Sequence, residues 1–190
     1  FSKENGAVTV IGGPHATITF KECLEDIEKL DVVVIGEAEI TIIELVNSLN
    51  ELSKIKGIVY RKDNKIIVNE PRRVNSELDL LPFPNRDLVE NNYKYLKSGI
   101  IGITLTRGCP FNCKFCQPAE RKIFGNKIRY RTGSNIADEL LFLYEKYRKY
   151  EFYISNDLFT LNKKWIDEIY TELKKRGLVG KIRFVVLSRV

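Results

Sequence analysis

The stretch GIIGITLTRGCPFNCKFCQPAE, residues 99–120, joins a short apolar run to a cluster of three cysteines. The run is rich in isoleucine and ends at Gly108, a pattern typical of a strand that turns sharply into a loop. Cys109, Cys113 and Cys116 follow at the spacing C-x₃-C-x₂-C. Thiolates are soft ligands suited to zinc and iron–sulfur clusters, so this spacing predicts a metal site on the loop.

The loop offers three ligands, whereas a structural zinc or an ordinary iron–sulfur cluster takes four. The chain has one more cysteine, Cys23, and one histidine, His15, both far upstream. Cys23 lies within a helical pattern and is best interpreted as a buried packing residue. Two interpretations stay open: a zinc or cluster site completed by a ligand from elsewhere, or a cluster with one open position that binds a small molecule.

Strand and helix patterns alternate after residue 99. Three strand-like runs are separated by two stretches with helical spacing of apolar residues, over 99–108, 134–150, 151–157, 163–176 and 181–190. This β-α-β-α-β order predicts neighbouring parallel strands. Such folds bind ligands at the carboxyl ends of their strands, and three groups fall there: the cysteine loop, Asn156-Asp157 and Ser188-Arg189.

The first half shows a related pattern. AVTVIGG (7–13) and DVVVIGE (31–37) are continuous apolar runs, and helical patterns follow them over 21–30 and 42–52. Strands that are apolar on both faces predict a parallel sheet covered on both sides. Residues 57–70 predict a hairpin that turns at Asp63-Asn64. The proline-containing stretch after them lacks periodicity and is interpreted as a connector.

Composition limits the class of protein. Hydrophobic residues make up 44% and charged residues 29%, ordinary values for a globular domain, and the sequence has neither a signal peptide nor a long apolar run. Clustered cysteines favour a reducing, cytoplasmic setting over a disulfide framework. Residues 99–190 carry 18 Lys and Arg against 9 Asp and Glu, which fits an anionic ligand or a solvated surface. The chain starts at Phe1 and has no methionine, so we expect a piece of a longer protein.

The motif C-x₃-C-x-aromatic-C, with Phe115 before the last cysteine, resembles the radical S-adenosylmethionine (SAM) superfamily. The resemblance implies that Cys109, Cys113 and Cys116 hold a 4Fe–4S cluster whose open iron binds SAM. An external one-electron reductant, of the flavodoxin or ferredoxin type, then drives cleavage of SAM to a 5′-deoxyadenosyl radical. It also implies SAM contacts from two strand ends and the loop: Phe115 at the adenine, Asn156 and Asp157 at the amino group, and Ser188 and Arg189 at the ribose or carboxylate. Arg129 and Arg131 are either further SAM or substrate contacts or ordinary exposed arginines.

Three upstream stretches, VIGGPHAT (10–17), VIGEAE (34–39) and ELDLLPFP (77–84), precede the cysteine loop in an order that resembles cobalamin-dependent radical SAM enzymes. The resemblance implies a cobalamin cleft at two strand ends, lined by Gly12, Gly13, Pro14, His15 and Glu37. His15 is not expected to be a cobalt ligand, because the motif that supplies one in other cobalamin proteins is absent.

Together these patterns predict an α/β protein with three parts. Residues 1–70 are expected to be the C-terminal half of a Rossmann-like cobalamin-binding domain, 71–98 a linker, and 99–190 the first β/α units of a radical SAM partial TIM barrel. The expected function is methyl transfer or related radical chemistry on a small-molecule or peptide substrate. We expect neither nucleic-acid nor membrane binding, and little activity from this piece alone. The alternatives are an RNA methylthiotransferase and a non-catalytic iron–sulfur or zinc protein.

Overall fold

The computed structural model describes residues 3–88, 100–114, 116, 119–155 and 158–188. The chain forms two compact units, and each is assembled from two separate segments. Unit 1 contains Phe1–Ser76 and Gly108–Ile128, and unit 2 contains Glu77–Arg107 and Arg129–Val190. The segment that carries the three cysteines therefore packs with the first part of the chain. This division follows packing, and the domain limits inferred from the sequence stay a prediction.

Unit 1 is built on a four-stranded sheet in the order β1-β2-β3-β4. Strands β1 (Val10–Ile11) and β2 (Val32–Val34) are parallel, as predicted. Strands β3 (Ile58–Lys62) and β4 (Lys65–Val68) extend the sheet in antiparallel pairing, which confirms the predicted hairpin. Its turn residues Asp63 and Asn64 both have positive φ, the combination that a two-residue type I′ turn requires.

Helices cover both faces of this sheet. Helices α1 (Pro14–Ile18) and α2 (Phe20–Asp26) pack against Val33, whereas α3 (Glu39–Asn47) packs against the opposite face of β2. All three valines of β2 are buried for this reason, as the continuous apolar run predicted. Cys23 lies on the buried side of α2 and belongs to the core, which confirms its role in packing.

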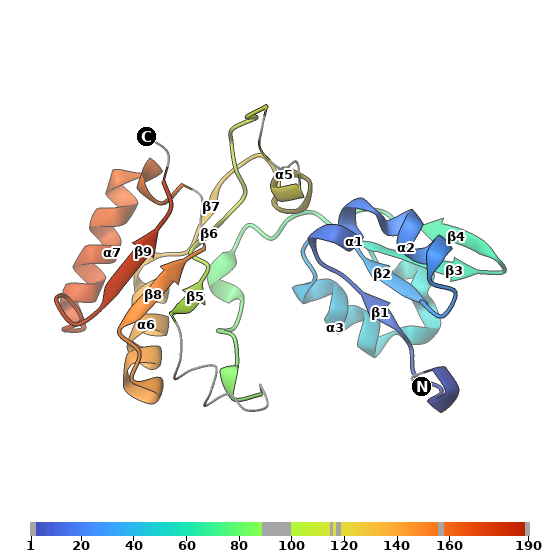
Figure 1. Cartoon of the computed structure of the whole chain (residues 1–190), viewed down its shortest axis with the longest axis horizontal. Helices are drawn as coiled ribbons and strands as arrows, with labels where there is room; N and C mark the ends of the chain where they lie inside the picture. Colours follow the sequence, from blue (N-terminus) through green and yellow to red (C-terminus); the bar gives the residue numbers. More distant parts are fainter. Residues whose placement is uncertain (1–2, 89–99, 115, 117–118, 156–157, 189–190) are drawn as a thin grey trace. The chain divides into compact units, whose positions relative to one another are not determined.

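Unit 2 is built on a three-stranded parallel sheet in the order β5-β8-β9 (Figure 1). Its strands are β5 (Ile101–Ile103), β8 (Glu151–Ile154) and β9 (Arg183–Val186), connected by α6 (Gly133–Tyr147) and α7 (Lys163–Lys175). One core joins both helices to the sheet, since Leu140 of α6, Trp165 of α7 and Phe152 of β8 are all buried in it. The predicted β-α-β-α-β order is confirmed.

Some boundaries differ from the sequence-based expectation. The strand predicted over 99–108 is broken into β5 and β6 (Thr106–Arg107), and β6 pairs antiparallel with β7 (Arg129–Tyr130). Helix α6 ends before residue 150, because Arg148 takes up a left-handed conformation with φ 54°. Helix α2 ends at Asp26, where the backbone becomes extended at Ile27.

The remaining elements are short. Helix α5 (Ala119–Phe124) lies in the cysteine-bearing segment, and short 3₁₀ helices occupy Lys3–Asn5, Leu49–Lys54, Leu78–Leu80, Arg86–Leu88 and Phe159–Leu161. Among the residues that the structure describes, none of the helices is long and apolar enough to span a membrane.

Candidate functional site

The cysteine loop is held at its base by the β6–β7 ribbon. Thr106 pairs with Tyr130 and Arg107 with Arg129, so the chain leaves and returns at adjacent positions. The loop begins at Gly108 with φ 87°, a conformation that other residues rarely adopt. A Cβ atom at this position would lie 2.3 Å from the carbonyl oxygen of Lys127. The loop therefore requires glycine at its first residue.

Two backbone hydrogen bonds shape the loop around the cysteines. The N–H of Cys109 donates to the Gly125 carbonyl at 3.4 Å, and the N–H of Cys116 donates to the Cys113 carbonyl at 3.2 Å. The second bond closes a single turn between the last two cysteines. Cys109 and Cys113 are half-buried and Cys116 is exposed.

The donor set of this loop has the chemistry of a metal site, with three thiols in one short segment. In the described residues, however, no three His, Cys, Asp or Glu side chains gather closely enough to hold a metal ion. Convergence of the three sulfurs on one centre stays a prediction. Helix α5, which follows the cysteines, lies against α1 within unit 1.

Four of the residues predicted to contact SAM, Phe115, Asn156, Asp157 and Arg189, lie outside the described residues. Ser188 is described; it is exposed after β9, and its hydroxyl contacts the hydroxyl of Thr160. Asn162 caps the first turn of α7, where its side-chain oxygen accepts from the N–H of Trp165 at 3.2 Å.

The carboxyl ends of β5 and β8 lie side by side, as the parallel order predicted. The N–H of Ser155 donates to the Ile103 carbonyl at 3.0 Å, which continues the pairing of the two strands. The hydroxyls of Ser155 and Thr104 are 3.0 Å apart, and both residues are exposed. Ser155 directly precedes positions 156 and 157 in the chain.

In unit 1, the residues predicted to line a cobalamin cleft follow two adjacent parallel strands. Gly12 and Gly13 follow β1, and Glu37 follows β2 through Gly36. Gly13 and Gly36 have positive φ, and a Cβ atom at either position would meet no described atom within 4 Å. The strand ends are therefore open and permit close backbone approach by a ligand.

The side chains around these glycines are engaged within unit 1. The N–H of Gly36 donates to the Thr17 hydroxyl at 3.1 Å, and the His15 ring nitrogen lies 3.2 Å from the Thr19 hydroxyl. The carboxylate of Glu37 accepts from the N–H of Asn75 at 2.8 Å. Pro14 and His15 are exposed at the start of α1.

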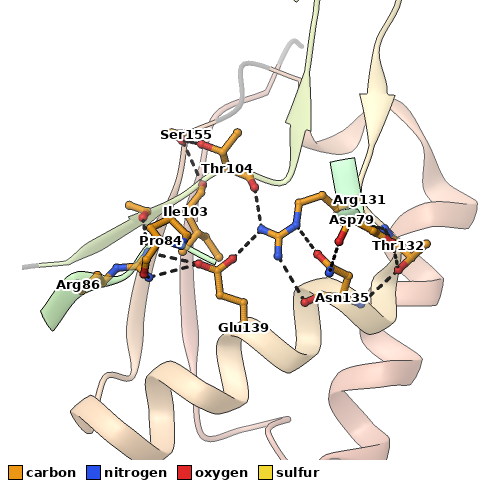
Figure 2. Close-up of polar contacts among 11 residues, drawn as sticks. Asp79, Pro84, Arg86, Ile103, Thr104, Arg131, Thr132, Asn135, Glu139 and Ser155 are labelled. Carbon is orange, nitrogen blue, oxygen red and sulfur yellow. Dashed lines mark hydrogen bonds and ion pairs between the residues drawn. The ribbon is translucent and has the colours of Figure 1, made fainter. Parts of the chain in front are cut away.

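A buried ion cluster lies beside β5 in unit 2 (Figure 2). The side chain of Glu139 is 2% exposed and accepts from Arg131 at 2.6 Å and from Arg86 at 3.4 Å. The two arginine side chains are only 11% and 10% exposed. Arg131 also donates to the side chain of Asn135 at 2.7 Å. Arg131 is therefore largely buried and engaged within unit 2, and it is not an ordinary exposed arginine.

Sequence reasoning missed Glu139 and Arg86, although a signal was present for the first. Glu139 falls three residues after Ile136 and four before Leu143, on the buried stripe of α6. A carboxylate at an inward helical position needs a buried partner. The partner Arg86 lies 53 residues away in the connector, so its position depended on the tertiary fold.

Two further contacts fix residues 79–87 of the connector along α6. The carboxylate of Asp79 accepts from the backbone N–H of Thr132 at 3.0 Å and from its hydroxyl at 2.6 Å, at the start of α6. The carboxylate of Asp87 accepts from the Tyr147 hydroxyl at 2.8 Å, at the end of α6. We call residues 79–87 the strap.

Tyr130 connects the β6–β7 ribbon to the core of unit 2. Tyr130 of β7 packs edge-on against Trp165, with ring centroids 5.0 Å apart, and burial raises the pKa of Tyr130. The indole N–H of Trp165 donates to the Arg131 carbonyl at 2.8 Å. The return strand of the ribbon is therefore fixed to α7.

Comparison with known proteins gives one family match. Residues 103–189 match the model of the radical SAM superfamily. An uncharacterized methyltransferase of Pyrococcus horikoshii is 36% identical over 95% of this chain. An anaerobic magnesium-protoporphyrin IX monomethyl ester cyclase of Cereibacter sphaeroides is 28% identical over 97% of the chain. The chain spans 39% and 31% of the lengths of these two proteins.

Two solved structures share the fold. One is the cobalamin-dependent SAM radical enzyme OxsB with aqua-cobalamin and SAM bound, which matches 96% of this chain with a TM-score of 0.76 at 22% identity. The match covers 26% of OxsB. The other is the radical SAM methyltransferase TsrM of Kitasatospora setae with cobalamin and a [4Fe-4S] cluster bound. It matches 94% of this chain and 36% of its own, with a TM-score of 0.75 at 18% identity. The α/β fold predicted from the sequence is thereby confirmed.

Proposed function

We propose that the chain is a member of the radical SAM superfamily, whose model matches residues 103–189, and part of an enzyme that cleaves SAM with a 4Fe–4S cluster and uses cobalamin as a second cofactor. The observation that carries the proposal is the cysteine loop. The loop lies within the family match and follows the parallel strand β5 through the short strand β6, and such folds bind ligands near the carboxyl ends of their parallel strands.

The residues present fit these groups. Cys109, Cys113 and Cys116 supply three soft thiolates and leave one iron of a cube without a protein ligand. The open strand ends at Gly13 and Gly36 leave room for a large ligand to approach the backbone. When bound, the cluster and SAM supply a 5′-deoxyadenosyl radical, and cobalamin supplies a methyl-transferring centre.

The chain's own residues would bind and orient these groups. Phe115, Asn156, Asp157, Ser188 and Arg189 are proposed to contact SAM. The proposed cobalamin residues are Gly12, Gly13, Pro14, His15 and Glu37. Of these, Glu37 already accepts a backbone hydrogen bond from Asn75, which fixes its carboxylate at the end of β2.

Methyl transfer is the reaction that we propose, on a small-molecule or peptide substrate. The name of the Pyrococcus relative favours it, whereas the Cereibacter relative is named as a cyclase, so cyclisation is the alternative reaction. We place the enzyme in a reducing, cytoplasmic setting with a flavodoxin- or ferredoxin-type reductant. An RNA methylthiotransferase is less well supported, because the one cysteine of the first half, Cys23, is buried in the core.

Anaerobic reconstitution of the full-length protein with iron and sulfide tests the proposal. After addition of SAM and a one-electron reductant, we expect a 4Fe–4S absorbance spectrum and release of 5′-deoxyadenosine. Replacement of Cys109, Cys113 and Cys116 by alanine should abolish both. The matched control is Cys23→Ala, which removes the fourth thiol without touching the loop.

Bound cobalamin is measured by its visible absorbance in the same samples, which separates the two cofactors. A protein that holds a cluster but yields no 5′-deoxyadenosine would favour the non-catalytic alternative. One that binds zinc at the loop in preference to a cluster would overturn the proposal.

A further inference from the structure

Strand β5 lies at one end of the three-stranded sheet, so its outer backbone groups need partners other than a strand. Arg86 donates to the Gly102 carbonyl at 3.4 Å, and Arg131 donates to the Thr104 carbonyl at 3.0 Å. Gly102 and Thr104 are two residues apart, and carbonyls at that spacing point to the same edge of a strand. Two guanidinium groups thus take the place of a neighbouring strand.

Both guanidinium groups are held by one carboxylate. Glu139 accepts from Arg131 with one oxygen and from Arg86 with the other, as Figure 2 shows. The strap supplies Arg86 and α6 supplies Glu139, so this ion pair joins the strap to α6. A buried carboxylate that loses its charge no longer fixes two arginines, and each of these then loses its partner.

We propose that Glu139 is a positioning residue for the proposed SAM site. Through Arg86 and Arg131 it fixes the outer edge of β5 and so sets the Thr104 end of this strand against Ser155 of β8. The proposal rests on the proposed function only for its ligand, because the edge contacts are features of unit 2 itself.

The position of the ion cluster of Arg86, Glu139 and Arg131 explains why SAM binding should depend on Glu139. Arg131 holds Thr104, and Thr104 lies 3.0 Å from Ser155, the residue before the two proposed to bind the SAM amino group. The same arginine directly follows β7, and its backbone carbonyl accepts from the indole N–H of Trp165, so its position is linked to that of the return strand of the cysteine loop. A shift of β5 would therefore move the strand ends around the proposed SAM site.

The test is Glu139→Gln in the full-length, cluster-reconstituted protein. Glutamine has nearly the same size but cannot offer a carboxylate to two arginines. We expect backbone hydrogen exchange over residues 101–107 to become about tenfold faster, at the scale of a lost charge-assisted contact. SAM binding, measured by equilibrium dialysis, should weaken about tenfold while iron content and the cluster spectrum stay unchanged.

Asp138→Asn is the matched control, because Asp138 is the adjacent residue of α6 and its carboxylate accepts from Arg176 at 2.8 Å. It should alter neither exchange over 101–107 nor SAM binding. If Glu139→Gln fails to fold, Arg86→Gln keeps the Arg131–Glu139 pair and should still accelerate exchange at Gly102 and its neighbours about threefold.

Two outcomes overturn the proposal. One is unchanged exchange in residues 101–107 of the variant. The other is faster exchange that is matched in α7, since Glu139 would then support only the overall stability of unit 2. Failure of the wild-type protein to bind SAM would refute the proposed function instead, and the exchange measurement would still decide the role of Glu139.

Discussion

The substitution Gly108→Ala should weaken cluster binding by the cysteine loop without unfolding unit 2. Gly108→Ala places a Cβ atom 2.3 Å from the Lys127 carbonyl and forces a positive φ on alanine. Strain of this kind costs about 1–3 kcal/mol, so the start of the loop has to shift. We expect unit 2 to stay folded and the iron content after reconstitution to fall at least about fivefold, since an energy of about 1 kcal/mol already corresponds to that factor.

Gly102→Ala is the control for this substitution. A Cβ atom at Gly102 would meet no described atom within 4 Å, so iron content should match that of the unaltered protein. Equal iron content in Gly108→Ala, measured by colorimetric assay, would contradict the importance of the glycine at the loop base.

At the level of single residues, the sequence predicted the chemistry better than the contacts. The spacing of Cys109, Cys113 and Cys116 indicated a metal site because ligand type and spacing are local properties. The buried state of Arg131 could not be inferred in the same way, because its partner Glu139 and its acceptor at Thr104 lie on other elements. Contacts of this range depend on how α6 packs against β5.

Among the elements, the start of the parallel β1–β2 pair is fastened by one carboxylate. Asp31 accepts from the N–H of Thr9 at 2.7 Å and from its hydroxyl at 3.0 Å, and it pairs with Lys3. Burial by itself raises the pKa of Asp31, but the hydrogen bonds from Lys3 and Thr9 outweigh it and leave this pKa below its ordinary value.

Asp31→Asn should therefore destabilise unit 1 by about 1.5 kcal/mol at pH 7, the lower end of the range for hydrogen bonds to a charged group, because the Asp31 side chain is 30% exposed. Because the folded pKa is lower than the unfolded one, the contribution is fully present above the unfolded value. It is lost as the pH falls below about 4, through the folded pKa. Urea unfolding of both proteins at pH 7 and pH 3 measures this, and the gap between them should shrink at pH 3.

The exposed pair of Glu51 and Lys54 is the control, since Glu51→Gln should change the unfolding free energy by less than about 0.5 kcal/mol. A gap between Asp31→Asn and wild type that is as large at pH 3 as at pH 7 would contradict the assigned role of the carboxylate.

Elements with a readable apolar pattern were predictable, and the strands of the β6–β7 ribbon were not. Helix α6 has a sustained apolar stripe, and the buried valines of β2 form a continuous run, so both could be recognised by periodicity. Strands β6 and β7 have two residues each and offer no period to read. Their pairing arises because the chain returns to unit 2 after the cysteine loop, which is a tertiary event.

In the whole molecule, the cysteine segment (108–128) leaves unit 2 after β6 and returns to it at β7, and these two strands are paired. Arg107 and Arg129 are directly paired, so replacing residues 108–128 by Asn-Gly would join β6 and β7 through a two-residue turn. We expect unit 2 to fold without the segment, with hydrogen exchange in α6 and α7 close to that of the intact protein, because no described residue of the segment belongs to the core of unit 2.

Loss of protection in α6 and α7 of this variant would show that the segment is required for the fold of unit 2. The same variant should bind no iron. A version that retains the segment but carries the three cysteines as alanines separates loss of ligands from loss of the backbone.

The arginine contacts along the outer edge of β5, which Glu139 completes and which we call its cap, can form only late in synthesis. Arg86 precedes β5 in the chain and Glu139 follows it, so a ribosome releases the strand before the residue that completes its cap. At about 5–20 residues per second, the edge is exposed for an interval on the order of seconds. An unpaired strand edge is a template for another chain during that interval. Slower elongation between β5 and α6 should therefore lower the yield of soluble protein, and faster elongation should raise it.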